Sequence, residues 1–208
     1  VRRTCSPGCS EAPMRDFLQA MAKSSAERAA EARSREPEAA LRRRALAAAP
    51  APPLRLRSAG FDLIAEIKHR SPSAGRLALR STPADIAARA AAYARGGAAA
   101  VSVLTEPDAF GGALDHLEAA ARDLPVPTLR KDFLVDPYQV LEARVAGAGG
   151  VLLVLRILDD ARARELLTRY SPLTVTGLTP HKTYTCTAQA GTKRGTGLRS
   201  RPSLPAIA

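Results

Sequence analysis

Short apolar runs alternate with Ala-rich helical segments through the middle of the chain. Strands are predicted where about four to six consecutive residues are mostly apolar, and helices where apolar positions recur at helical spacing over a longer stretch. The predicted strands lie at 62–67, 99–104, 126–130 and 150–155, and the predicted helices at 83–95, 113–122, 137–146 and 159–169. This alternation is typical of an α/β protein in which helices cover parallel strands.

Several of the predicted helices carry recognisable end signals. Asp85 stands in the first turn of the helix at 83–95, which Gly96 and Gly97 terminate. Pro137 opens the third helix, and Asp159 is a candidate N-cap for the fourth. These signals support four successive strand–helix units.

Two architectures accommodate such units, a doubly wound sheet and a (β/α)8 barrel. A nucleotide-binding doubly wound sheet has a glycine-rich phosphate motif after its first strand. Here the residues after that strand are Lys68-His69-Arg70-Ser71-Pro72-Ser73. The missing glycines favour the barrel.

The first fifty residues have a different character. Residues 1–13 show no periodicity and are expected to be an extension with free thiols at Cys5 and Cys9. Residues 14–47 are helical in composition, with Pro37 at the first turn of a second helix. A stiff linker, AAPAPP, follows. We expect a solvated amphipathic helix pair without a chemical role.

The charge is basic overall but unevenly distributed. Lys and Arg total 31 against 20 Asp and Glu, which gives a net charge of +11. Residues 166–208 contain no acid and contribute +6 of this, leaving +5 for residues 1–165. No basic helix with interleaved aromatic residues accompanies the charge, so no nucleic-acid partner is expected. The excess equally fits an enzyme for anionic substrates.

Other classes are excluded by simple counts. No apolar run approaches the roughly 20 residues that span a bilayer. Three Cys in 208 residues do not form the framework of a secreted disulfide-rich protein. We therefore expect a cytoplasmic protein without a membrane partner, and no signal in the sequence calls for a metal or another cofactor.

Charged residues gather at the ends of the predicted strands. Glu66 and Lys68 have the same parity and point to one face, and the third strand runs into Lys131-Asp132-Phe133. In a barrel the carboxyl ends of the strands form the active face. Because charges are costly at buried strand ends, a functional cluster is favoured over a structural ion pair or a solvated end.

The order of the motifs resembles the indole-3-glycerol-phosphate synthase family, whose members are (β/α)8 barrels of tryptophan biosynthesis. The resemblance covers residues 14–168. Its motifs are Ile64–Lys68 with Ser71-Pro72-Ser73; Ser102–Pro107 with Phe110-Gly111-Gly112; Leu129–Phe133 with Asp136–Gln139; and Glu142-Ala143-Arg144 followed by Gly147-Ala148 and Val151–Leu153.

The resemblance implies a reaction and a set of site residues. The family closes the pyrrole ring of 1-(2-carboxyphenylamino)-1-deoxyribulose 5-phosphate, a small phosphorylated substrate, with loss of carbon dioxide and water and without a cofactor. Lys131 then corresponds to the general acid, Lys68 to a contact for the substrate anion and phosphate, Glu66 to a polar contact at the reacting end, Ser71 to the substrate-binding loop, and Phe110 and Phe133 to apolar walls for the anthranilate ring. Ring closure places negative charge on oxygen, which a nearby ammonium can protonate.

The chain departs from the family after the fourth helix. A complete barrel takes about 250 residues, whereas here a Thr-rich segment begins near Thr168. The family's fifth-strand glutamate base, the Asn and Arg near its sixth strand, the Glu-Ser-Gly segment of its seventh strand and its phosphate-binding glycine loops have no counterpart in residues 169–208, which lack Asp, Glu and Asn. We therefore expect an incomplete barrel with little activity alone. The alternative is a non-catalytic half-barrel that only binds or associates, and open edges predict a homodimer in either case.

Residues 169–208 form a basic, Thr-rich tail. The segment from Thr168 holds nine Thr in 41 positions, against four in the preceding 167. Period-two alternation at 173–176 and 183–187 is typical of antiparallel strands. The tail weakly resembles the later strands of a fibronectin type III domain, with Tyr184 as the corner tyrosine. A reading-frame slip in a GC-rich gene is the other explanation.

Overall fold

The computed structural model describes residues 12–54, 61–77 and 82–169, together with short strands at 183–184, 189–192, 195–199 and 206–207. The chain divides into two compact units, residues 1–171 and residues 172–208. Among the described residues, no helix combines the length and the apolar character that a membrane crossing requires.

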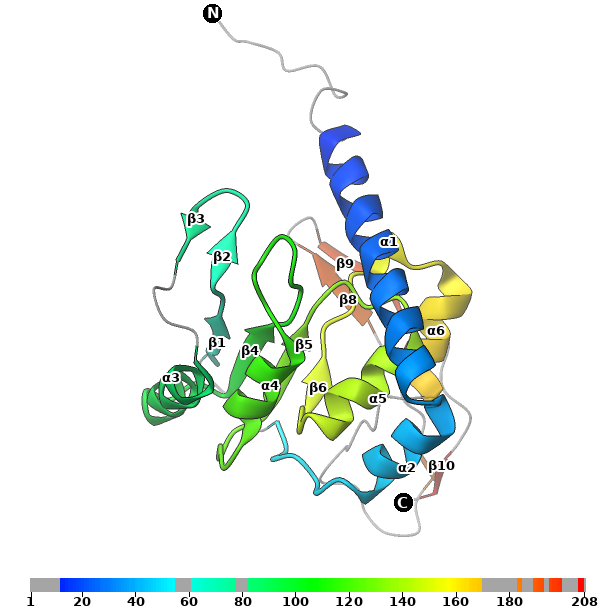
Figure 1. Ribbon diagram of the computed structural model, residues 1–208. Helices are drawn as coiled ribbons and strands as arrows, with labels where there is room; N and C mark the ends of the chain where they lie inside the picture. Colours follow the sequence, from blue (N-terminus) through cyan, green and yellow to red (C-terminus); the bar gives the residue numbers. More distant parts are fainter. Residues whose placement is uncertain are drawn as a thin grey trace, which may run out of the picture. The chain divides into compact units, whose positions relative to one another are not determined.

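Four parallel strands form the sheet of the first unit (Figure 1). They are β1 (Ile64–Ile67), β4 (Ala100–Leu104), β5 (Thr128–Lys131) and β6 (Gly150–Val151), and each pairs with the next along the chain. A doubly wound sheet would reverse its strand order at a switch point. The unreversed order is that of a barrel, which confirms the predicted incomplete (β/α)8 architecture.

Helices follow the strands as predicted, and their ends are capped. They are α3 (Pro83–Arg95), α4 (Leu114–Ala121), α5 (Pro137–Val145) and α6 (Asp160–Arg169). Capping boxes begin α3 and α5, through Thr82 with Asp85 and Asp136 with Gln139. Asp159 accepts a hydrogen bond from the Arg162 amide at 2.7 Å, which confirms it as an N-cap.

The core lies between the helices and one face of the sheet. Val101 and Val103 of β4 are fully buried and pack with Ile86 of α3 and Leu117 of α4. Successive side chains of a strand alternate between faces. The opposite face of the sheet therefore carries Ile64, Glu66, Ser102, Leu129 and Lys131, and this is the face that lines the interior of a barrel.

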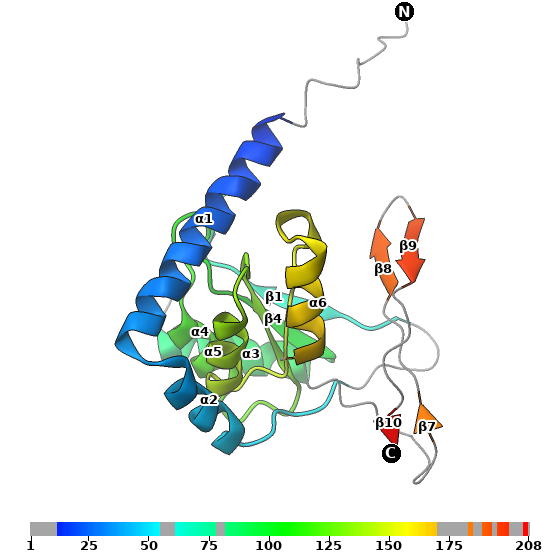
Figure 2. The ribbon, with the colours of Figure 1, turned by 90° about the vertical axis from the view of Figure 1, so that its right-hand side faces the viewer.

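Two helices precede the sheet, α1 (Ala12–Arg35) and α2 (Glu38–Ala47) (Figure 2). Pro37 is the N-cap of α2 and so stands one position before the predicted first turn. Leu41 and Ala45 pack against Tyr138 and Leu141 of α5. The expectation of a merely solvated helix pair is therefore wrong, because α2 shares a small core with α5.

Two local features differ from the predicted elements. The fourth strand is shorter than predicted: β6 ends at Val151, and a 3-10 turn, η1 (Leu155–Ile157), follows. The reason is that β5 ends at Lys131, one position beyond the Arg130–Val151 pair, so residues after 152 have no ladder to join. A hairpin of β2 (Arg70–Ser71) and β3 (Gly75–Arg76), which was not predicted, follows β1.

In the second unit, the described residues form two antiparallel strand pairs. They are β7 (Thr183–Tyr184) with β10 (Ala206–Ile207), and β8 (Gln189–Thr192) with β9 (Gly195–Arg199). The alternation at 183–187 thus includes an antiparallel strand at its first two positions. The segment at 173–176 lies outside the described residues, and the fibronectin resemblance stays a prediction.

Candidate active site

Two lysines converge on one carboxylate at the carboxyl end of the sheet. Lys68 Nζ lies 2.9 Å from Glu66 Oε1, and Lys131 Nζ donates a hydrogen bond to Glu66 Oε2. Glu66 and Lys68 come from β1 and the residue beyond it, and Lys131 ends β5. About a third of each side chain is exposed, so the cluster is accessible to a ligand.

The two ammonium groups keep Glu66 ionised. Partial burial by itself raises the pKa of Glu66, but hydrogen bonds from Lys131 and Lys68 outweigh burial and hold this pKa below its ordinary value. The cluster therefore carries two ammonium groups and one carboxylate, a net positive charge. Such a site attracts an anionic ligand and offers a proton donor to an oxygen that gains negative charge.

Three aromatic rings from separate segments of the chain pack against one another. The Phe110 and Phe133 rings lie 6.3 Å apart between centroids, at an interplanar angle of 37°. Phe17 of α1 meets Phe133 edge-on, with centroids 6.0 Å apart. Phe110 and Phe133 were expected as apolar walls from the family resemblance, whereas Phe17 belongs to a helix that was expected to be solvated.

Ser71 lies in the hairpin of β2 and β3 and pairs with Ser73 instead of with the lysine cluster. Its Oγ is 3.1 Å from that of Ser73, and none of the hydrogen bonds among the described residues joins it to Glu66, Lys68 or Lys131. Its neighbour Arg70 connects the hairpin to the loop that carries Phe110, because the Arg70 amide donates to the Phe110 carbonyl at 3.1 Å.

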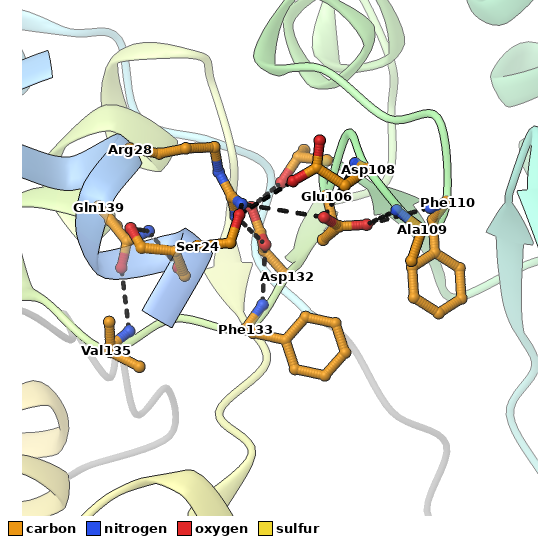
Figure 3. A network of polar contacts seen from close by, with 12 residues as sticks. Ser24, Arg28, Glu106, Asp108, Ala109, Phe110, Asp132, Phe133, Val135 and Gln139 are labelled. Carbon is orange, nitrogen blue, oxygen red and sulfur yellow. Dashed lines mark hydrogen bonds and ion pairs between the residues drawn. The ribbon is translucent and has the colours of Figure 1, made fainter. Parts of the chain in front are cut away.

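Two buried carboxylates, Glu106 and Asp132, accept hydrogen bonds from the backbone just after β4 and β5 (Figure 3). Glu106, fully buried after β4, accepts hydrogen bonds from the amides of Asp108, Ala109 and Phe110. Asp132 accepts from the Thr105 hydroxyl and the Phe133 amide, each at 2.8 Å. Glu106 and Asp132 stood in the sequence motifs without an assigned role.

A side chain from α1 reaches the same carboxylates. Arg28 Nη2 donates to Asp132 Oδ1 at 2.9 Å, and Arg28 Nη1 lies 3.8 Å from Glu106 Oε1. The contact spans 104 positions of sequence, which no local pattern reveals. The N-terminal helices were expected to have no chemical role, and the structure shows that α1 nevertheless contacts the carboxylates at the strand ends.

No cluster of three or more His, Cys, Asp or Glu side chains with metal-binding geometry occurs in residues 12–54, 61–77 and 82–169 or in the described strands of the tail.

Comparisons with known proteins show the family to which the chain belongs. The family profile described as "Indole-3-glycerol phosphate synthase" matches residues 18–179. Proteins of that name from Parafrankia sp. (strain EAN1pec) and Nocardioides sp. (strain ATCC BAA-499 / JS614) are 53% and 51% identical over 123 and 122 residues, which are 59% of this chain and 45% and 46% of the relatives. The protein of that name from Mycobacterium leprae (strain Br4923) is 45% identical over 142 residues, 67% of this chain and 51% of its own length.

The chain spans about half the length of the curated relatives that it matches. The family profile covers most of the chain, from α1 through α6. By this match, and by four parallel strands in barrel order, the chain belongs to the indole-3-glycerol phosphate synthase family, a family of decarboxylating lyases of tryptophan biosynthesis.

Proposed function

We propose that this chain provides the anion-binding and proton-donating part of a site that closes the indole ring of 1-(2-carboxyphenylamino)-1-deoxyribulose 5-phosphate. The observation that carries the proposal is the convergence of Lys131 and Lys68 on Glu66 at the carboxyl ends of β1 and β5. Family membership supports the choice of substrate.

The proposed chemistry assigns a role to each predicted residue. The ring carbon that bears the carboxylate attacks the ketone carbon of the sugar, and the ketone oxygen takes a proton from Lys131. Carbon dioxide then leaves, and the electron pair of the broken bond returns to the ring and restores its aromaticity. The new hydroxyl takes up a proton and leaves as water while the neighbouring sugar carbon loses a proton, which forms the pyrrole double bond. Lys68 contacts the anionic groups of the substrate, and Ser71 belongs to the substrate-binding loop.

Glu66 and the aromatic wall position the substrate in this scheme. Glu66 holds the two ammonium groups in place and provides a polar contact at the reacting end. Phe110 and Phe133 offer an apolar surface of two tilted rings for the anthranilate ring. The net positive charge of the cluster favours capture of a substrate that carries a carboxylate and a phosphate.

The test is an assay of indole-3-glycerol phosphate formation, followed by the fluorescence of the product. We expect the chain alone to be at least about 100-fold slower than a complete relative, since loss of one acid, base or oxyanion contact alone commonly costs that much. Addition of the C-terminal part of the Parafrankia relative, beyond the matched segment, should restore turnover. Lys131→Met should abolish the restored activity.

The alternative function is association without catalysis. It would be supported if the two parts form a stable complex that binds no substrate and shows no turnover. A complex that turns over, and loses turnover with Lys131→Met but not with Lys23→Met on the exposed surface of α1, would exclude it.

We further propose that two copies of the chain pair through the open edges of the sheet. In the described residues β1 and β6 are the outer strands, and Ile64 and Leu152 at these edges are 49% and 41% exposed. A two-fold axis along the strands would keep every strand parallel and join β6 of each copy to β1 of the other, giving eight strands and no edge.

Light scattering coupled to size-exclusion chromatography tests the dimer. We expect a dimer at micromolar concentration and a monomer for Leu152→Glu, because a charge on the inner edge opposes closure. The matched variant Leu46→Glu, at an exposed position of α2, should stay dimeric. A wild-type monomer that unfolds cooperatively would contradict the proposed dimer.

We also propose a cytoplasmic location, which the biosynthetic role of the family supports.

A further inference from the structure

We propose that Arg28 is a positioning residue of the site, which acts from α1 by holding the carboxylates that order the ends of β4 and β5. The guanidinium lies against Asp132 Oδ1 at 2.9 Å and Glu106 Oε1 at 3.8 Å (Figure 3). It forms no hydrogen bond or ion pair with Lys131 or Phe110 among the described residues, so its influence on them passes through these two carboxylates.

Both carboxylates need a cation because they are withdrawn from water. The side chains of Glu106 and Asp132 are 0% and 1% exposed, whereas Arg28 is 27% exposed and lies at the outer end of the network. A buried, unpaired carboxylate is strongly unfavourable. Asp132 also pairs with Arg130, but Arg28 is the one cation within 4.0 Å of Glu106 in the described part of the chain.

The two carboxylates in turn fix the backbone that presents the site. Glu106 gathers the amides of Asp108, Ala109 and Phe110 at 2.7 to 3.0 Å, which sets the loop from which the Phe110 ring projects. Asp132 stands between Lys131 and Phe133 and accepts a hydrogen bond from the Phe133 amide. Through these two carboxylates, Arg28 connects α1 to the backbone that carries Lys131, Phe110 and Phe133.

Ser24 completes the attachment one helical turn earlier. Arg28 Nη1 donates to Ser24 Oγ, and Ser24 Oγ donates to Asp108 Oδ2, each at 2.9 Å. Residues four apart lie on the same helix face, so Ser24 holds the guanidinium in the orientation that reaches both carboxylates. A lysine lacks the planar fork and can satisfy one carboxylate at a time.

Hydrogen exchange of individual amides tests the inference without an activity assay. Arg28→Gln should speed exchange at Ala109, Phe110 and Phe133 by about tenfold or more, while Val103 in β4 changes less than about twofold. Arg28→Lys should give an intermediate effect. The control is Arg35→Gln, which removes an exposed pair with Glu31 on the same helix and should change none of these amides.

A second readout connects positioning to the site, and this part rests on the proposed function. Anthranilate is fluorescent, and the chain contains no Trp, so its binding can be followed by anthranilate emission. Arg28→Gln should weaken binding by about five- to tenfold, with partial recovery in Arg28→Lys. These changes together with the local exchange pattern would support the inference.

The outcomes separate the two proposals. If Arg28→Gln speeds exchange locally while the wild-type protein binds no anthranilate, the result would support Arg28 as a positioning residue and count against the proposed substrate. Exchange that is unchanged in Arg28→Gln, or that rises equally at Val103, would overturn the inference, because Arg28 would then be dispensable or would stabilise the whole unit.

Discussion

Glu66 and Lys131 meet across an intervening strand. The Lys131 ammonium donates a hydrogen bond to Glu66 Oε2 although β4 lies between β1 and β5 in the sheet. The register places Glu66 beside Ser102, and Ser102 beside Leu129, so Lys131 reaches back by two positions. The contact ties the first strand to the third at the end of the sheet where the site lies.

Because of this contact, part of the free energy of unfolding depends on pH in the acidic range. Because the folded-state pKa of Glu66 is below its ordinary value of 4.5, its contribution is fully present above that value and is lost as the pH falls through the lowered pKa. Glu66→Gln should therefore reduce the free energy of unfolding at pH 7 by about 0.5–1 kcal/mol, as a partly exposed pair does.

Urea denaturation at pH 7, 5, 4 and 3 checks this. The difference between wild type and Glu66→Gln should shrink below pH 4.5. Glu31→Gln, which breaks an exposed pair with Arg35 on α1, should change the stability little at pH 7. A Glu66→Gln difference that is constant from pH 7 to pH 3 would show that the carboxylate is not stabilised by the lysines.

The helices and strands of the first unit were largely predictable because their signals are local. The predicted helix at 83–95 has the observed bounds of α3, since Thr82, Asp85 and the glycines at 96 and 97 mark both ends. The fourth strand was overestimated because strand length is set by the neighbouring strand, and β5 offers β6 only a short ladder.

The grouping of the candidate site residues could be predicted from the sequence only where those residues lie close to one another along the chain. The parity of Glu66 and Lys68 implied one face, and their position at a strand end implied chemistry. The attachment of Asp132 to Arg28, and of Phe133 to Phe17, depends on how α1 packs, and the weak apolar pattern of α1 does not define that packing.

Gly112 should tolerate no side chain. A Cβ at Gly112 would lie 2.3 Å from the Leu104 carbonyl oxygen and 2.7 Å from the carbonyl carbons of Leu104 and Thr105, all backbone atoms at the end of β4. Backbone cannot move aside as a flexible side chain can, so Gly112→Ala should destabilise the protein by about 1–3 kcal/mol or more.

The matched control is Gly96→Ala at the end of α3. Its Cβ would lie 3.4 Å from two carbonyl oxygens, an ordinary contact, and its φ of −74° suits any residue. Thermal denaturation of both variants measures the difference. Equal midpoints for Gly112→Ala and Gly96→Ala would mean that the end of β4 moves freely, contrary to its hydrogen bonds.

Tyr138 should fasten α1 to α5. Its hydroxyl lies 3.1 Å from the Ala32 carbonyl and 2.9 Å from the Glu36 carbonyl at the end of α1, and its ring is nearly fully buried. Tyr138→Phe keeps the ring and removes the hydroxyl, so it should cost about 1 kcal/mol of the free energy of unfolding.

Tyr93→Phe in α3 provides the comparison for Tyr138→Phe. Its hydroxyl makes no hydrogen bond within the described ranges, so this variant should be within about 0.5 kcal/mol of wild type in urea denaturation. If Tyr138→Phe were equally neutral, the hydroxyl contacts with the end of α1 would contribute nothing to stability.

His69 and His116 should make the fold sensitive to mild acid. Their rings lie 4.5 Å apart, and Nε2 of His69 and Nδ1 of His116 are buried without a hydrogen-bond partner among the described residues. Burial lowers both pKa values. The pKa of His69 is lowered further by His116 and by Arg89 on α3, whereas Asp115 opposes the shift at His116.

The sign of the pH dependence follows from these shifts. Between the lowered pKa values and the ordinary value of 6.5, the unfolded chain binds more protons than the folded chain, so stability falls as the pH drops below 6.5. The loss is absent above that pH and levels off below the folded pKa values. Each proton that the unfolded chain binds and the folded chain does not lowers the free energy of unfolding by about 1.4 kcal/mol per pH unit.

His116→Phe isolates this effect because it keeps an aromatic ring against His69 and removes one titrating group. The free energy of unfolding should fall less steeply between pH 7 and pH 5 in His116→Phe than in wild type, when measured by urea denaturation at half-unit intervals. His181 is present in both proteins, so its own titration cancels in the comparison. Parallel curves for the two proteins over this range would contradict the prediction, since they would show that His116 binds protons equally in the folded and unfolded chain.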